Sequence, residues 1–331
     1  MVRSGNTIAS RGTKLRSSFF EHDGARSFRQ VVEAALGPRA VDSGRLRLIV
    51  GDDGCGKRTM VRSLLEKHAV ERDGPRVKRM PLVHVSLGMV SVPTDVLLAC
   101  LGAIGCRIPA WRSKDGLLEV VRREYGHLDV RAVMFTDADA LAIGREEVAS
   151  HKVFRTIDLL LRENRFDAVL VGSPLLRDLF RVTGGARAQA TAKMLRARLR
   201  DSAMMYPFGE DTKQDFVKVL QEIDRIVSAD GETSFLETAP DPFLEATDGS
   251  IGRLVNLVEL ACEIALSCKR EHLVAEDFAE AAPQMGCPRE PFDGVVFGPV
   301  EPPRAKSKPS AFENAEGQGE LYGGWSRGNG T

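Results

Sequence analysis

The sequence lacks the features that mark membrane, secreted and zinc-binding proteins. No apolar run approaches the roughly 18 residues that a membrane-spanning helix requires, and the polar N-terminus has no apolar signal-peptide core. The 6 cysteines form no Cys-x-x-Cys pair, and the 6 histidines show no metal-ligand spacing. We therefore expect a cytoplasmic protein with free thiols, no membrane partner and no zinc site.

Net charge is absent too. The 46 basic and 46 acidic residues balance, so any contact with DNA would come from local patches rather than from bulk charge. No Ser-His-Asp or Cys-His set for nucleophilic catalysis can be identified. A chain of 331 residues with 43% hydrophobic residues is long enough for about two globular domains.

Apolar runs alternate with helical patterns in the first two thirds of the chain. The strands are predicted at 46–50, 82–87, 131–136, 167–172 and 203–207. This alternation predicts an α/β domain, a parallel five-stranded sheet flanked by helices, that binds its ligand at the carboxyl ends of the strands.

The rest of the chain differs in composition. We expect residues 1–24 to form a flexible N-terminal arm, 25–210 the α/β nucleotide-binding domain, 211–285 a small all-helical domain and 286–331 a disordered tail. The helices of the small domain are predicted at 211–228, 241–247, 251–268 and 275–282.

A glycine-rich loop directly follows the first predicted strand, and we call residues 51–59 the phosphate loop. Such a loop presents backbone N–H groups to phosphates at a helix N-terminus, and Lys57 would reach the terminal phosphates. We therefore predict a nucleoside triphosphate ligand; a glycine-rich turn without ligand is the alternative. The candidate binding residues are Gly51, Asp52, Asp53, Gly54, Cys55, Gly56, Lys57, Arg58 and Thr59.

Two positions depart from the chemistry that Mg²⁺ requires. The motif places Ser or Thr after the lysine, whereas this chain has Arg58, with Thr59 one place late. An acidic pair that binds the metal ion and activates water is expected at the end of the strand at 131–136. This strand instead ends in Thr136 followed by Asp137. Thr59 and Asp137 remain as candidate metal ligands, and Asp137 as the candidate hydrolysis acid; the alternative is that Asp137 caps the loop.

Three further side chains are candidates for the site. Ser173 follows the strand at 167–172 and could contact the γ-phosphate or cap the next helix. Arg198, in a basic stretch before the last strand, could reach a neighbouring subunit's nucleotide, line a DNA channel or belong to a solvated helix face. Arg253 opens a long helix and could point to the γ-phosphate or lie in solvent.

Taken in order, these residues resemble the AAA+ ATPases of bacterial transposons, the TniB/TnsC family. The resemblance covers about residues 25–283. It rests on the phosphate loop, on the stretch 166–176, which is similar to the family's sensor strand, and on the stretches 243–254 and 273–278, which are similar to its lid helices.

The resemblance implies an AAA+ P-loop NTPase fold with a small helical lid, and ATP with Mg²⁺ as cofactors. It also implies a homo-oligomer, a ring or filament on double-stranded DNA, that links the target to a transposase and a target-selection protein. It makes Lys57 the phosphate lysine, Asp137 the hydrolysis acid, Ser173 and Arg253 sensors and Arg198 the arginine acting in trans. Because Arg58 and Thr136 both affect Mg²⁺ handling, we expect weak or absent hydrolysis. The alternatives are a non-hydrolysing nucleotide-binding scaffold and an AAA+ ATPase of another pathway.

Overall fold

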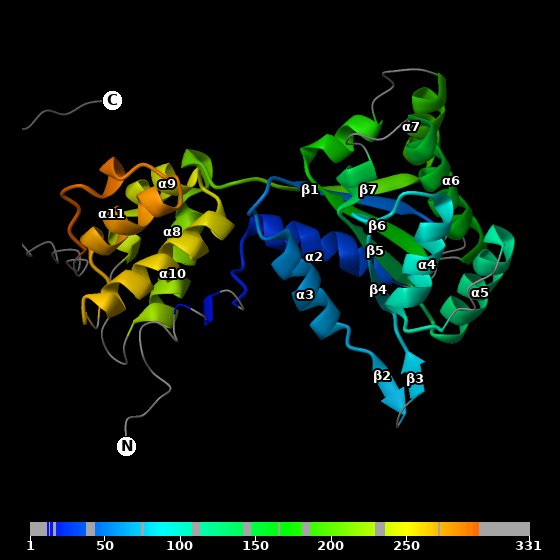
Figure 1. Cartoon of the computed structure of the whole chain (residues 1–331), viewed down its shortest axis with the longest axis horizontal. Helices are drawn as coiled ribbons and strands as arrows, with labels where there is room; N and C mark the ends of the chain where they lie inside the picture. Colours follow the sequence, from blue (N-terminus) through cyan, green and yellow to red (C-terminus); the bar gives the residue numbers. More distant parts are fainter. Residues whose placement is uncertain are drawn as a thin grey trace, which may run out of the picture.

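The computed structural model describes residues 12, 14–15, 18–37, 44–73, 76–107, 113–141, 147–164, 166–180, 186–228, 236–270 and 272–297. Its main sheet has the strand order β4-β5-β6-β1-β7, and every neighbouring pair is parallel (Figure 1). The strands are β1 (Leu46–Gly51), β4 (Leu82–Ser86), β5 (Ala132–Thr136), β6 (Asp167–Gly172) and β7 (Leu199–Met205). This arrangement confirms the predicted parallel five-stranded sheet.

Helices cover both faces of the sheet, which is why the central strands read as continuous apolar runs. In β1, Ile49 packs toward α2 and α3, whereas Leu48 and Val50 belong to the cluster on the opposite face. The first face carries α2 (Asp23–Leu36) and α3 (Lys57–Lys67). The opposite face carries α4 (Pro93–Ala103), α5 (Lys114–His127), α6 (Glu147–Asn164) and α7 (Ala186–Arg198).

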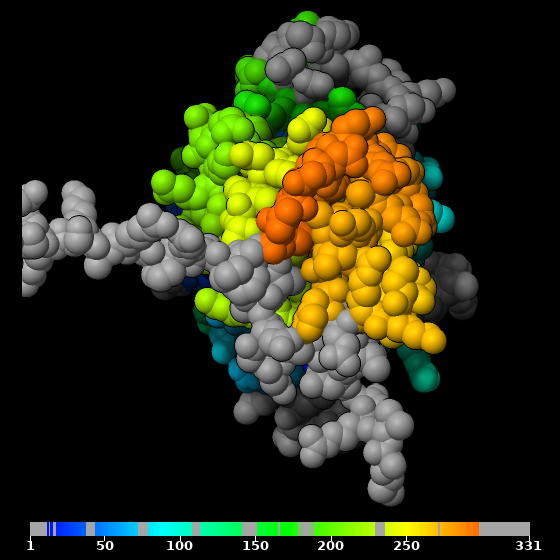
Figure 2. Space-filling view, turned by 90° about the vertical axis from the view of Figure 1, so that its left-hand side faces the viewer, coloured from blue at the N-terminus to red at the C-terminus, as the bar shows by residue number. Residues whose placement is uncertain are grey.

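The helices that follow β7 form a separate lobe with its own hydrophobic core (Figure 1). This helical lobe contains α8 (Lys213–Val227), α9 (Pro240–Thr247), α10 (Ile251–Ser267) and α11 (Ala275–Gln284), with short 3₁₀ turns at Glu210–Thr212, Leu236–Thr238 and Glu290–Phe292. In Figure 2 this lobe faces the viewer, in yellow-green to orange. Among the described residues, no helix combines the length and apolar character that a membrane span requires.

Part of the segment for which we predict a flexible arm packs into the helical lobe. Leu15 is 1% exposed and Phe20 is 5% exposed, and both belong to the hydrophobic core of that lobe. Residues 1–11, 13 and 16–17, and residues 298–331 of the predicted tail, lie outside the described residues. The domain boundaries therefore stay predictions.

Several elements differ from the sequence prediction. The last strand begins at Leu199 rather than 203, because its first residues are exposed and pair with β1 through the backbone without an apolar pattern. A hairpin of β2 (Glu71–Asp73) and β3 (Arg76–Arg79) projects from the sheet and was not predicted (Figure 1). Ser173 is followed by a 3₁₀ turn, Pro174–Phe180, and another 3₁₀ turn spans Ala138–Leu141 after β5.

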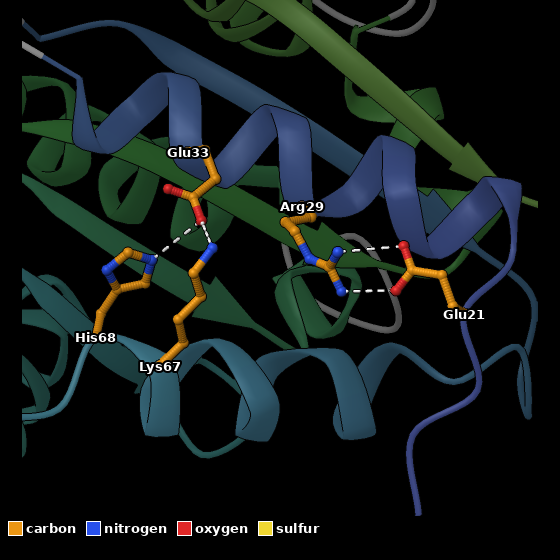
Figure 3. A network of polar contacts seen from close by, with 5 residues as sticks. All are labelled: Glu21, Arg29, Glu33, Lys67 and His68. Atoms are coloured by element: carbon orange, nitrogen blue, oxygen red, sulfur yellow. Dashed lines mark hydrogen bonds and ion pairs between the residues drawn. The ribbon is translucent and has the colours of Figure 1, made fainter.

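Charged side chains of α2 tie together the elements that frame the phosphate loop (Figure 3). Glu33 accepts a hydrogen bond from Lys67 at the end of α3 at 2.6 Å and lies 3.3 Å from His68 Nε2. The bond from Lys67 lowers the pKa of Glu33. At the other end of α2, Arg29 donates two hydrogen bonds to Glu21, at 3.1 and 2.8 Å. These contacts link α2 to the end of α3 and to Glu21.

Candidate functional site

The phosphate loop connects β1 to α3 at the carboxyl edge of the sheet. Gly56 is the N-cap of α3 with φ 90°, a left-handed conformation that glycine adopts without strain. No side chain caps this helix, so the N–H groups of its first turn are available to an anion. The predicted loop geometry is therefore suited to phosphate.

The ammonium group of Lys57 lies folded over this loop. Its Nζ donates to the carbonyl oxygens of Gly51 at 2.6 Å and Asp52 at 2.7 Å. Asp53 is fully exposed, with its Oδ1 3.9 Å from Lys57 Nζ. The side chain of Cys55, a residue of the loop itself, is buried. Burial raises the pKa of its thiol, so the uncharged form is favoured.

A pocket of about 480 Å³ opens beside the loop. Three segments that are distant in sequence line it: residues 15–22, the start of α3 and the start of α10. Arg58 and Thr59 line it from α3, and Asn256 from α10. His22, another lining residue, packs edge-on against Phe208, and burial lowers its pKa. The pocket combines an apolar wall with polar groups, as small-molecule sites do.

The first turn of α10 contacts the phosphate loop through the backbone. Gly252 donates its N–H to the carbonyl oxygen of Gly54 at 2.7 Å. Ser250 caps the helix by accepting the N–H of Arg253 at 3.4 Å. Arg253 lies at the helix start as predicted, but its half-exposed side chain pairs with Asp248 and does not line the pocket.

Four polar side chains meet at the ends of β4 and β5. Asp137 follows β5 in a left-handed conformation, φ 53°, and accepts a hydrogen bond from Ser86 Oγ at 2.7 Å. The Thr136 hydroxyl lies 2.9 Å from His84 Nε2. Burial lowers the pKa of His84, and the charge of Asp137 opposes this shift.

Sequence reasoning identified Asp137 but missed His84 and Ser86. The sequence pattern that could have indicated His84 and Ser86 is a pair of polar residues, two positions apart, near the end of an otherwise apolar strand. In a strand this spacing places both on one face, and Ser86 is aligned with Thr136 in the parallel register.

Ser173 follows β6 at the same edge of the sheet. Its Oγ is buried and has no hydrogen-bond partner among the described residues. A buried hydroxyl without a partner is unfavourable. An oxygen atom of a bound ligand could accept a hydrogen bond from the Ser173 hydroxyl and remove this cost.

Arg198 lies at the opposite edge of the sheet. It forms an ion pair with the buried Asp158 and donates to the carbonyl oxygen of Gly44 at 2.8 Å, just before β1. The phosphate loop follows the other end of that strand. Arg198 is therefore placed away from its own subunit's phosphate loop.

Comparisons with known proteins agree with this architecture. Residues 41–180 match a family model described as AAA domain. No curated protein matches the sequence. Among solved structures, Cdc6p from Pyrobaculum aerophilum superposes with a TM-score of 0.52 at 14% identity, covering 91% of this chain and 71% of that chain.

Two further solved structures give similar results. The Aeropyrum pernix ORC2 protein in ADPNP-ADP complexes has a TM-score of 0.56 at 14% identity, covering 78% of this chain and 65% of that chain. Drosophila ORC bound to DNA has a TM-score of 0.57 at 13% identity, covering 88% of this chain and 69% of that chain. The chain thus has an AAA+ P-loop NTPase fold matching Cdc6 and ORC structures.

Proposed function

We propose that this AAA-type P-loop NTPase is an ATP-dependent regulator of DNA transposition. It oligomerises on double-stranded target DNA and links that DNA to a transposase and a target-selection protein. ATP acts mainly as an assembly switch that is turned over slowly.

Binding of ATP is supported by the arrangement around Lys57, and this is the observation that carries the proposal. The phosphate loop offers N–H groups and an ammonium to the phosphates, and the adjoining pocket of about 480 Å³ has room for a nucleoside. The start of α10 is hydrogen-bonded to the phosphate loop, so a change in the loop on nucleotide binding would also affect the helical lobe.

Slow turnover is supported by the hydrogen bonds among the four polar side chains at the ends of β4 and β5. Asp137 would orient the attacking water, but its carboxylate accepts the Ser86 hydroxyl. At the preceding position, where a carboxylate would direct the metal ion, the chain has Thr136. Ser173 would contact the γ-phosphate from the adjacent strand, and Arg253 would do so if its pair with Asp248 opened.

Association with DNA and with further copies is proposed from two sources. The sequence resembles the TniB/TnsC family, and one protein of the same fold is Drosophila ORC bound to DNA. Transposition, with its transposase and target-selection partners, rests on the family resemblance. Arg198 is proposed to act in trans on a neighbour's nucleotide.

The test uses the full chain, linear duplex DNA and electron microscopy, with ATP, ADP or no nucleotide. We expect rings or filaments on DNA with ATP only, and their loss in Lys57→Ala. A search of the neighbouring genes for a transposase, followed by pull-down with that protein, then tests the partner. ATP-dependent assembly on DNA without transposase binding would leave an AAA+ protein of another pathway, and assembly that ignores nucleotide would contradict the switch.

A nucleotide-binding scaffold that does not hydrolyse ATP is the second candidate, and the Ser86–Asp137 hydrogen bond favours it. Steady-state phosphate release with DNA present separates the two. Undetectable release, together with stable ATP-dependent assemblies, would support the scaffold. Release at the rate of ordinary AAA+ ATPases would contradict both slow turnover and the scaffold.

A further inference from the structure

We propose that Arg58 takes the place of Mg²⁺ at the phosphates, so that this site binds a nucleoside triphosphate without a divalent cation. The inference rests on the nucleotide binding proposed above and specifies how the phosphate charge is neutralised.

The first support is the position of Arg58. It is the second residue of α3, where the motif has a metal-binding hydroxyl, and it lines the pocket together with Gly56 and Thr59. Its side chain is exposed, and within the described part of the chain its guanidinium has no hydrogen-bond or ion-pair partner. The positive charge is therefore available to a ligand.

The second support is the charge at the start of α3. Lys57 and Arg58 both lie in its first turn, and that turn contains no acidic residue. The N-terminus of a helix carries a partial positive charge, and the Lys57 ammonium is held by the carbonyl oxygens of Gly51 and Asp52. The Arg58 guanidinium adds a second positive charge at this helix end, and an anion of several charges would be attracted to both, which points to a polyphosphate as the occupant.

The third support is that the residues present do not fit Mg²⁺. This ion prefers carboxylate and other hard oxygen ligands in a strict octahedral arrangement. Thr136 supplies only a hydroxyl, which contacts His84 at 2.9 Å, and the carboxylate of Asp137 accepts a bond from Ser86 at 2.7 Å.

Thr59 does not repair this loss. One residue along an α-helix turns the side chain by about 100°, so Thr59 does not occupy the place that the motif gives to residue 58. A guanidinium is permanently charged and can donate two parallel hydrogen bonds to a phosphate. Arg58 thus supplies charge and geometry that a metal ion would otherwise provide.

The experiment measures binding of radiolabelled ATP to the full chain by equilibrium dialysis, in EDTA and in Mg²⁺. For the wild type we expect dissociation constants that agree within about threefold in the two buffers. Arg58→Ser should bind about tenfold or more weakly in EDTA, as expected for loss of a charged hydrogen bond. Arg58→Lys, which keeps the charge but not the planar fork, should fall between them.

Arg62→Ser is the matched control, because it removes the same charge from the same helix at a residue that does not line the pocket. It should bind like the wild type. Circular dichroism of each variant checks folding. If the wild type loses about tenfold or more of its affinity in EDTA, or if Arg58→Ser binds normally there, the inference is overturned while nucleotide binding stands. Absence of binding in both buffers would overturn both.

Discussion

Gly252 donates its backbone N–H to the carbonyl oxygen of Gly54 at 2.7 Å, joining the first turn of α10 to the phosphate loop. The first N–H groups of a helix have no partner within the helix, so this bond satisfies a donor that would otherwise be free. The two backbones approach so closely that side chains are excluded between them. We therefore expect a displacement of either element to affect the other.

Gly252→Ala should separate the loop from the helical lobe. A Cβ at this position would lie 2.9 Å from Gly54 Cα and 3.0 Å from its carbonyl oxygen, so α10 must shift. We expect ATP affinity to fall by about tenfold, with unfolding stability reduced by about 1–2 kcal/mol. Gly102→Ala in α4, where nothing lies within 4 Å of the new Cβ, should instead gain about 0.5–1 kcal/mol. Fluorescent-nucleotide titration and urea unfolding provide the measurements, and unchanged affinity in Gly252→Ala would contradict the coupling.

Ser173→Ala should leave the stability of the nucleotide-free protein almost unchanged but reduce its stabilisation by ATP. Its Oγ is buried without a partner, so its removal should leave the unfolding free energy of the nucleotide-free protein within about 0.5 kcal/mol of wild type. The thermal stabilisation by ATP should be smaller than in the wild type, because the ligand loses a hydrogen bond. Ser250→Ala, which removes the N-cap of α10, should cost about 1 kcal/mol without ligand. Equal stabilisation of Ser173→Ala and wild type by ATP would argue against a sensor role.

His84 should be neutral at pH 7. Burial lowers the pKa of His84 below 6.5, and the negative charge of Asp137 only partly opposes this shift. Asp137→Asn removes that charge, so it should lower the titration midpoint of His84 further. The folded protein binds this proton less readily than the unfolded chain, so the contribution to stability is complete above pH 6.5 and declines as pH falls through that value. NMR titration of the imidazole protons, assigned by comparison with His84→Gln, provides the check. A midpoint above 6.5, or a rise in Asp137→Asn, would show that the cluster is wrongly described.

Arg198→Ala should destabilise each subunit, because it leaves the 5% exposed Asp158 with one fewer cation and frees the carbonyl oxygen of Gly44. The loss should be about 1–3 kcal/mol. Asp158→Asn breaks the same pair but keeps the guanidinium, so it serves as the control for stability. If Arg198 also acts in trans, Arg198→Ala alone should lose turnover. Mixing it with Lys57→Ala should restore part of that turnover, because the Arg198→Ala subunit keeps an intact phosphate loop and the Lys57→Ala subunit next to it keeps an intact Arg198. Failure of the mixture to regain turnover would leave Arg198 a structural role.

Lys193 and Arg200 should contribute to binding of duplex DNA. Both are exposed, in and just after α7, a helix whose first turn contains no acidic residue. Replacing both by alanine should weaken binding equally for all sequences and reduce the slope of log affinity against log salt by about 2. Lys218→Ala with Lys269→Ala removes the same charge from exposed positions of the helical lobe. Fluorescence anisotropy at several salt concentrations measures both, and identical slopes for the two pairs would exclude the basic stretch as a DNA contact.

Local patterns were enough for most of the fold. β1 and β6 are buried along their whole lengths, and such strands produce apolar runs that can be recognised without knowledge of their neighbours. β7 was placed too late because an edge strand with exposed first residues has no such run. The helices of the helical lobe were found because their apolar spacing follows the 3.6-residue period.

The sequence by itself determined β1, β4, β5 and β6, the helices of the helical lobe and the phosphate loop, because hydrophobic period and glycine spacing act over a few neighbouring residues. Only the tertiary structure decided that Gly252 meets Gly54, that Ser86 engages Asp137, that Arg198 pairs with Asp158, and that Leu15 and Phe20 are buried with the helical lobe. The residues of each such contact lie far apart in the chain. Their meeting depends on how whole elements pack, which no local pattern encodes.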